Sequence, residues 1–453
     1  MDQRIAAELS ELIADPARVL SAPAVLDRLS HDFYWYSPIL RGKLAAKRCD
    51  VAVQTIDVEE VLAVLRFAGR HEIPVTARGA GTGNYGQCVP LEGGIVLDLS
   101  LMDKLEEITP DGVAVCQPGL RLAVLETEAR KAGWELRMYP STLAKASVGG
   151  FLGGGSGGIG SITYGGLIDP GNVLGARVVT VEDEPRVLEL QGDAAQAVNH
   201  AYGTTGIITA VEIALAPVWP WFDLVVAVDA FPAALRIGHR AALADGIVKK
   251  LLTPLEWPIP GYFRHFNRGE FPAGRSCLIA MVAEPSLAPF EALVAAEGGE
   301  ITYCVPLAEG PGARPLYECT WNHTTLHALK IDRTITYLQA RYPADRVLET
   351  VAEIGALFGD ELMAHLEVIR GGGRVTVSGL HLIRYTTPER LDEIFDLHEA
   401  RGVVIANPHV YTLEDGTRYK RAVAADQSAF KRHADPYGLL NPGKMRSFTP
   451  VGR

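Results

Sequence analysis

Two glycine-rich segments constrain the fold of this chain more than any other feature. The first, "PVTARGAGTGNYGQCVP", spans residues 74–90, and the second, "VGGFLGGGSGGIGSITYGGLIDPGNVLG", spans residues 148–175 and holds twelve of the 46 glycines. In the second segment, apolar residues such as Phe151, Ile159 and Leu167 interrupt the glycines at short intervals. Large apolar residues at such intervals are not typical of a solvated, flexible Gly/Ser linker. We therefore expect a backbone packed closely against a flat or charged ligand, with the apolar side chains anchored in a core.

The first segment contains a literal G-x-G-x-x-G, formed by Gly81, Gly83 and Gly86. This pattern marks a Rossmann dinucleotide site only when a strand precedes it and a helix follows directly. The run "IPVTAR" fits the strand, after the helical pattern "VEEVLAVLRFAGRHE". Pro90 and a new strand-like run, "IVLDL", follow too soon for a crossover helix, which needs about ten residues. The sequence therefore predicts a glycine-rich loop between two strands, whose backbone N–H groups cradle a diphosphate.

Composition and charge exclude several classes of protein. The net charge is −11 and no long basic run occurs, which argues against a nucleic-acid partner. The sequence contains no stretch of about 18 uncharged apolar residues, which is the length needed to span a membrane. The first twenty residues resemble an amphipathic helix ending before Pro23 and not a signal peptide. The six cysteines are dispersed without a C-x-x-C pair, so we expect reduced thiols and a cytoplasmic location.

Five segments together resemble a known family. They are the first glycine loop, the stretch "MYPSTLAKASVGGFLGGGSGGIGSITYG", the following "YGGLIDPGNVLGARVVT", the run "AYGTTGIITAVEIALAP" and the C-terminal "DPYGLLNPGKM". In this order they resemble the vanillyl-alcohol oxidase / p-cresol methylhydroxylase (PCMH-type) FAD-binding oxidoreductases. The resemblance covers roughly residues 50–217 and the last twenty or so residues of the chain.

The resemblance implies an α+β fold with three parts. Residues 1–217 would form the FAD-binding domain, with two α/β subdomains, and residues 218–400 a substrate or cap domain with an antiparallel sheet flanked by helices. Residues 401–453 would return to the FAD domain. Local patterns agree, since "WFDLVVAVDAF", "SCLIAMVAE" and "GRVTVSGLHLIRY" are typical of strands, and "AALRIGHRAALAD" and "PERLDEIFDLHEARG" of helices.

The resemblance also implies which residues contact FAD: Arg78, Gly79, Ala80, Gly81, Thr82, Gly83, Asn84, Pro140, Ser141, Thr142, Gly149, Gly150, Gly153, Gly154, Ser156, Gly157, Gly206, Ile207, Ile208, Asn441 and Lys444. Several family members attach the flavin to a histidine late in the first loop, where this chain has Thr82. Residues 134–175 contain no cysteine that could form the alternative bond. We therefore expect FAD to be bound non-covalently.

Catalysis requires a base, a group that orients the substrate and donors to the reduced flavin. The segment "VVIANPHVYTLEDG" places Asn407, His409 and Tyr411 at alternate positions, which in a strand point to one face. We therefore favour this cluster as the catalytic site, with His409 or Tyr411 as base. Further candidates in the same region are His323, His381 and Arg384.

A metal site in the cap is the less favoured interpretation. His323 and His327 are four residues apart and share a helix face, but no third ligand accompanies them. Family members of the glycolate, D-lactate and D-2-hydroxyglutarate dehydrogenase kind carry an H-x-H metal pair and an E-H-G-I-G segment. Here "SGLHLIRY" has one histidine, and "IANPHVY" stands in place of the second motif.

The sequence thus predicts an FAD-dependent oxidase or dehydrogenase that oxidises an alcohol or 2-hydroxy acid by hydride transfer to FAD. Its partners would be a small-molecule substrate and an electron acceptor, which is oxygen, a quinone or a carrier protein. A reductase using NAD(P)H and a metal-assisted D-2-hydroxyacid dehydrogenase remain alternatives. A non-catalytic FAD protein is disfavoured, because the polar cluster would then have no role.

Overall fold

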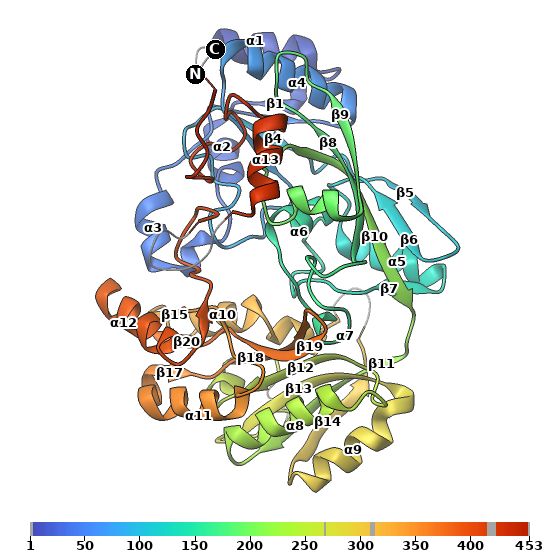
Figure 1. Ribbon diagram of the computed structural model, residues 1–453, viewed down its shortest axis with the longest axis vertical. Helices are drawn as coiled ribbons and strands as arrows, with labels where there is room; N and C mark the ends of the chain where they lie inside the picture. The colour runs from blue at the N-terminus through green and yellow to red at the C-terminus, as the bar shows by residue number, and fades with distance from the viewer. Residues whose placement is uncertain (1–2, 267–268, 309–312, 415–422, 452–453) are drawn as a thin grey trace.

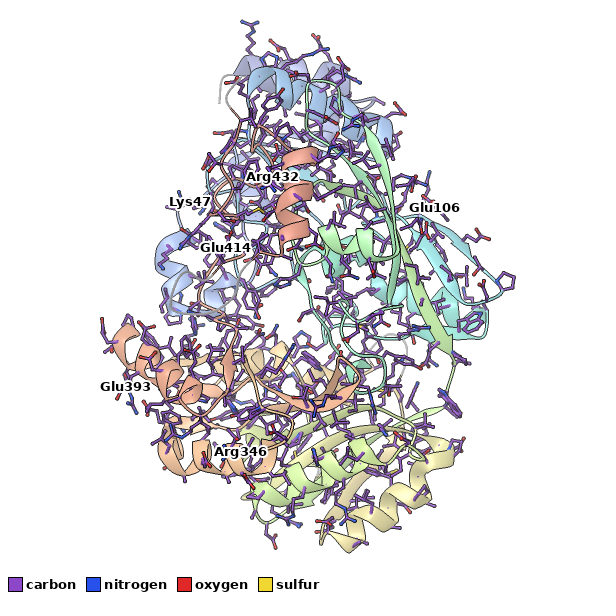
Figure 2. All side chains as sticks on the ribbon, viewed as in Figure 1. Lys47, Glu106, Arg346, Glu393, Glu414 and Arg432 are labelled. Carbon is purple, nitrogen blue, oxygen red and sulfur yellow. The ribbon has the colours of Figure 1, made fainter. Side chains whose placement is uncertain are left out.

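The computed structural model describes residues 3–266, 269–308, 313–414 and 423–451. It consists of two bodies, an upper one built on two sheets and a lower one built on three (Figure 1). The chain passes from the upper to the lower body between β10 (Ile207–Pro217) and β11 (Trp221–Val228). Charged side chains such as Lys47, Glu106 and Glu393 lie at the periphery of the molecule (Figure 2).

The first sheet of the upper body carries the strands that flank the first glycine loop. Its four strands follow the order β1 (Val19–Leu20), β2 (Val51–Gln54), β4 (Ile95–Asp98) and β3 (Val75–Arg78). Helices α1 (Gln3–Leu12) and α4 (Val58–His71) pack together beside this sheet. Strands β3 and β4 are parallel neighbours, and residues 79–94 between them contain no helix. The predicted strand–loop–strand arrangement is confirmed, and the Rossmann interpretation is excluded.

The second sheet of the upper body has six strands. They are β5 (Leu105–Ile108), β6 (Val113–Cys116), β10, β8 (Val173–Val179) and β9 (Val187–Gln191), with β7 (Trp134–Leu136) also paired to β10. Strands β8 and β9 form an antiparallel pair, joined by the polar segment between Val179 and Val187. Helix α5 (Leu122–Lys131) and the short α6 (Val148–Gly154) and α7 (Ser161–Tyr164) accompany this sheet. Helix α6 was not expected, because four of its seven residues are glycines.

The lower body contains three antiparallel sheets. The first follows the order β12 (Lys249–Leu255), β13 (Ser276–Ala283), β11 and β14 (Glu300–Pro306), and the second β15 (Ile335–Tyr337), β20 (Leu382–Arg384) and β17 (Leu362–Met363). The third follows β18 (Leu366–Gly371), β19 (Arg374–Gly379), β16 (Ala340–Arg341) and β21 (Val404–Ile405). Helices α8 (Phe231–Leu243), α9 (Leu287–Ala296) and α11 (Val347–Phe358) lie on the side away from the upper body, and α12 (Pro388–Glu399) lies at one edge (Figure 1). The predicted strands and helices of this region are confirmed.

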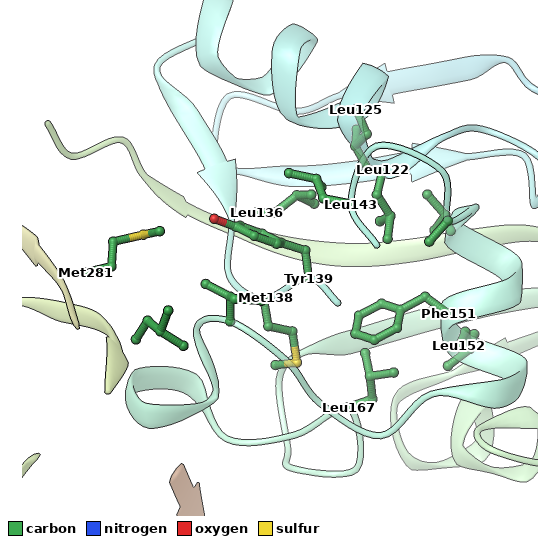
Figure 3. Packing of buried hydrophobic residues seen from close by; sticks show 14 of the residues in the cluster. Leu122, Leu125, Leu136, Met138, Tyr139, Leu143, Phe151, Leu152, Leu167 and Met281 are labelled. Carbon is green, nitrogen blue, oxygen red and sulfur yellow. The ribbon is translucent and has the colours of Figure 1, made fainter. Parts of the chain in front are cut away.

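One hydrophobic cluster crosses the boundary between the two bodies. Tyr139 and Phe151 of the upper body belong to the same cluster as Met281 of β13 (Figure 3). A buried ion pair accompanies it, because Lys250 Nζ of β12 donates to Glu135 Oε1 of β7 at 2.7 Å. The two bodies therefore share a continuous core.

The last residues of the chain return to the upper body. After α13 (Ala425–Ala434), Val75 of β3 donates a backbone hydrogen bond to Leu439 and accepts one from Asn441.

Before this return, the strand expected over residues 407–411 is absent, because β21 ends at Ile405 and a turn follows. The Asn407 side chain accepts the backbone N–H of His409, and this local hydrogen bond favours a turn over a strand. The argument that Asn407, His409 and Tyr411 share one strand face is therefore wrong.

No helix in the described residues is long and apolar enough to cross a membrane.

Candidate active site

A cavity of about 630 Å³ lies between the two bodies. Its upper wall is formed by both glycine-rich segments and by residues 200–208. Its lower wall is formed by the start of α10 (Asn322–Leu329) and by β16, β19 and β21. An N-terminal segment, represented by Asp32, Phe33 and Tyr36, completes the wall.

The first glycine loop needs its glycines for space and for backbone geometry. Gly81 has φ +64, and a Cβ there would overlap the guanidinium of Arg78. A Cβ on Gly79 would likewise overlap the hydroxyl of Ser147. Arg78 itself donates to the carbonyls of Leu29 and His31 at 3.0 and 2.9 Å, so this arginine fastens the loop to the N-terminal segment.

Ser147 joins the two glycine-rich segments. Its hydroxyl oxygen accepts the backbone N–H of Gly150 at the start of α6 and that of Ala80 in the first loop, at 3.3 and 3.4 Å. Gly149 lies against Pro118, where a Cβ would overlap the proline ring. The sequence missed this serine, although Ser before a short apolar run is a typical helix N-cap.

Most residues predicted to contact FAD line the cavity. They are Arg78, Gly79, Ala80, Gly81, Thr82, Gly83, Asn84, Pro140, Ser141, Thr142, Gly149, Gly150, Gly153, Gly154, Ser156, Gly157, Gly206 and Ile208. Ile207, Asn441 and Lys444 lie outside the wall. Asn441 Nδ2 donates to the carbonyls of Gln87 and Tyr202, and Lys444 Nζ donates to the carbonyl of Gly86. These two polar residues support the first loop from behind.

A buried charged cluster lies behind the same loop. Burial raises the pKa of Asp32, and the ammonium of Lys444 opposes this shift. Burial also lowers the pKa of Lys444, and the Asp32 carboxylate opposes that shift. Cys88 lines the cavity beside this pair, and burial raises its pKa to about 11. Its sulfur is therefore a protonated thiol at neutral pH and a weak nucleophile.

The lower wall carries one guanidinium and one unbonded imidazole. Arg341 of β16 faces Ser378 of β19 and Val404 of β21 in register, and all three line the cavity. His323 of α10 also lines it, and its ring has no hydrogen-bond partner among the described residues. Burial, with His327 and Lys330 nearby, lowers the pKa of His323 to about 4, so the imidazole is neutral at pH 7.

Trp321, just before α10, has an unusual backbone. Its φ of 51 and ψ of −140 lie in a region that residues with a Cβ rarely adopt. The Trp321 N–H donates to Glu367 Oε1 at 2.7 Å, and Thr253 Oγ1 donates to Glu367 Oε2 at 2.5 Å. His365 Nε2 lies 2.9 Å from Glu367 Oε1. This buried network holds Trp321 on the cavity wall.

Four of the predicted catalytic residues lie away from the cavity wall. His409 is 2% exposed, and its ring nitrogens lie 2.7 Å from Ser37 Oγ and 2.9 Å from the Tyr337 carbonyl oxygen. Tyr411 packs under Lys444, whose Nζ lies 5.3 Å from the ring centroid. His381 is bonded to Tyr342 at 2.6 Å, and Arg384 is exposed and pairs with Asp332. Asn407 and His323 line the cavity.

The two histidines of the possible metal site have different surroundings. His327 Nε2 lies 3.2 Å from the Glu318 carbonyl oxygen, and His327 does not line the cavity wall that carries His323. No group of three His, Cys, Asp or Glu side chains within the described part of the chain could hold a metal ion.

Several residues of the wall escaped the sequence analysis. Asp32, Phe33 and Tyr36 lie in "HDFYWY", whose cluster of aromatic residues so close to the N-terminus was the available signal. Lys145 and Arg341 also line the cavity. Neither has a distinctive sequence context, because a single cation in a turn or a short strand is common on protein surfaces.

Comparisons with known proteins identify the cofactor. Residues 49–188 match the family described as FAD binding domain. The chain is 26% identical to an uncharacterized FAD-linked oxidoreductase of Mycobacterium tuberculosis, over 96% of this chain and 98% of that protein. It is 25% identical to the D-2-hydroxyglutarate dehydrogenase of Stutzerimonas stutzeri, over 98% of this chain and 99% of that enzyme. These matches show an FAD-binding domain in this chain and similarity to FAD-linked oxidoreductases along its length, and they do not single out vanillyl-alcohol oxidase.

A solved structure supports the fold. The structure of alkyldihydroxyacetonephosphate synthase superposes with a TM-score of 0.73, covering 98% of this chain and 85% of that chain at 14% identity. The expected α+β fold with a PCMH-type FAD-binding domain is confirmed.

Proposed function

We propose that this FAD-binding oxidoreductase oxidises a 2-hydroxy acid to the 2-oxo acid. The observation that carries the proposal is Arg341, a guanidinium on the cavity wall that has no carboxylate partner among the described residues. A guanidinium binds a carboxylate through two parallel hydrogen bonds. Relatives named D-lactate dehydrogenase, glycolate oxidase subunit and D-2-hydroxyglutarate dehydrogenase support the same substrate class.

His323 is the better candidate for the base than His409. A base must reach the substrate hydroxyl directly or through one water molecule. His409 is buried with both ring nitrogens engaged, whereas the ring of His323 is unbonded and lies on the cavity wall. In the proposed reaction His323 removes the hydroxyl proton while Arg341 holds the carboxylate. FAD held by the glycine-rich upper wall would supply the acceptor for the hydride of the carbon that carries this hydroxyl group.

The upper wall is suited to hold FAD without a covalent bond. Both glycine-rich segments line this wall, and glycine-rich backbone can approach a diphosphate closely. Lys145 is the cation available there, because Arg78 is engaged by carbonyls. We accordingly assign residues 1–217 to an FAD domain, residues 218–400 to a cap and residues 401–453 to a returning segment.

The test is anaerobic mixing of the purified holoenzyme with glycolate, lactate and 2-hydroxyglutarate, each as both enantiomers where they exist. Loss of the yellow flavin absorbance with formation of the 2-oxo acid is the expected result. If no 2-hydroxy acid bleaches the flavin while NADPH does, the proposal is replaced by the reductase alternative. Adding oxygen, a quinone or a carrier protein afterwards identifies the electron acceptor.

Matched variants locate the chemistry. Arg341→Met should raise the KM by about 10- to 100-fold, the typical worth of a charge-assisted hydrogen bond. Arg384→Met is the control, because Arg384 is a surface arginine paired with Asp332. His323→Asn should slow flavin reduction by about 10²- to 10⁴-fold, whereas His327→Asn on the same helix should leave the rate near that of the wild type. Equal effects within either pair would contradict the assignment.

A further inference from the structure

The lower wall of the cavity carries little charge apart from Arg341. Among the described residues that line the cavity, the cations are Arg78, Lys145 and Arg341, and Asp32 is the acidic residue. Arg78, Lys145 and Asp32 belong to the upper wall or to the N-terminal segment. Arg341 is therefore the single cation facing a substrate from the described residues of the lower body, and it can neutralise one carboxylate.

The neighbours of Arg341 include an exposed apolar side chain. Val404 pairs directly with Arg341 across β16 and β21, and directly paired residues of an antiparallel sheet lie on the same face. Val404 lines the cavity and is 61% exposed. Because Val404 is exposed on the cavity wall, an apolar group of a bound ligand can pack against it.

Other apolar side chains line the same cavity. Leu326 lies three residues after His323 on α10, so both side chains point to the same side of the helix, and both line the cavity. Trp321 of the lower body and Phe33 of the N-terminal segment also line the cavity, and Phe33 is 38% exposed. Apolar side chains thus line the cavity that also carries the residues proposed to bind the carboxylate and the hydroxyl of the substrate.

We infer that the substrate is a 2-hydroxy monocarboxylic acid with a bulky apolar side chain, which packs against Val404, Leu326 and Trp321. This inference rests on the proposed function and makes it more specific. A dicarboxylate such as 2-hydroxyglutarate would place its second carboxylate on an apolar surface without a second cation, which is unfavourable. Glycolate would leave the apolar surface uncovered.

The experiment compares 2-phenyllactate and 2-hydroxyisocaproate with glycolate, lactate, glycerate and 2-hydroxyglutarate. The measurement is the rate constant of anaerobic flavin reduction divided by the substrate Kd, using the FAD-loaded enzyme. Each buried methylene group should raise this ratio by about fourfold. 2-Phenyllactate should therefore exceed glycolate by at least about tenfold, and 2-hydroxyglutarate should be a poorer substrate than 2-hydroxyisocaproate.

A second experiment tests whether a variant gains preference for a dicarboxylic acid. Val404→Lys adds an ammonium beside Arg341 at an exposed position, where the fold tolerates a lysine. It should shift the preference toward 2-hydroxyglutarate over 2-phenyllactate by at least about tenfold, because the second carboxylate gains a partner. Leu243→Lys is the control, since Leu243 is 57% exposed at the end of α8 and does not line the cavity.

The outcomes separate this inference from the proposed function. If glycolate, glycerate or 2-hydroxyglutarate reduces the flavin best, the inference that the substrate has a bulky apolar side chain is refuted, and the proposed 2-hydroxy acid activity stands. The same inference is refuted if Val404→Lys leaves the preference for 2-phenyllactate over 2-hydroxyglutarate unchanged while Arg341→Met weakens binding of every acid. If none of the acids reduces the flavin, the proposed function and this inference are both refuted.

Discussion

Removing the buried carboxylate of Glu135 should destabilise the protein strongly. Glu135 and Lys250 are each 1% exposed, and their charged atoms lie 2.7 Å apart at the boundary between the two bodies. Trp221 Nε1 also donates to Glu135, at 2.8 Å to Oε2, and Lys250 Nζ also donates to the Leu136 carbonyl. In Glu135→Gln the ammonium of Lys250 stays buried without a counter-charge.

The magnitude follows from a comparison with a surface pair. Breaking a buried ion pair by removing one partner costs about 3–5 kcal/mol, because a buried charge is left uncompensated. Glu128 and Lys131 form a pair of the same 2.7 Å length, but their side chains are 40% and 65% exposed. Exposed pairs contribute about 0–1 kcal/mol. At roughly 2 °C per kcal/mol, Glu135→Gln should lower the Tm by about 6–10 °C, and Glu128→Gln by at most about 2 °C.

The assay is thermal unfolding of the FAD-loaded variants at equal protein and FAD concentrations. The double variant Glu135→Leu/Lys250→Met should recover much of the lost Tm, because replacing both charges by apolar groups of similar volume is often nearly neutral. Tm values for Glu135→Gln and Glu128→Gln that agree within about 2 °C would refute the reasoning.

Four further predictions concern the cofactor and the base. Gly81→Val should abolish FAD binding, because Gly81 has φ +64 and its Cβ would overlap Arg78; the purified variant should lack yellow absorbance. Acid precipitation should release FAD into the supernatant, and colour retained in the pellet would contradict a non-covalent bond. Lys145→Gln should weaken binding of FAD and of ADP but not of riboflavin, which has no phosphate, and titration of the apoprotein with each ligand checks this. The pKa of His323 is lowered to about 4, so its base form is present above that pH; flavin reduction should fall as the pH drops through about 4 and stay level toward neutrality.

Neighbouring residues in the chain were enough to predict the path of the first glycine loop and the close packing of the second glycine-rich segment, although helix α6 was not expected. The distance from Gly86 to Pro90 leaves no room for a helix, so the first loop had to join β3 to β4 directly. The alternation of glycine and apolar residues over 148–175 indicated a packed segment, and Phe151 and Leu167 are buried in the core. Such features depend on neighbours in the chain, and for this reason β11, β13, β19, β20, α8 and α12 of the lower body were also predicted correctly, whereas the strand expected over residues 407–411 is absent.

The set of side chains that meet at the cavity follows instead from the packing of distant segments. His409 and His323 are both histidines in polar segments, yet one is enclosed between Ser37 and Tyr337 and the other faces the cavity. Arg78 lines the cavity, as expected of a residue that contacts the cofactor, and its guanidinium also donates to the carbonyls of Leu29 and His31, some fifty positions away. Asp32 and Arg341 come together with the glycine loops through the packing of segments that are remote in the chain. Such contacts cannot be predicted from the pattern of neighbouring residues, because they depend on how both bodies are placed around the cavity.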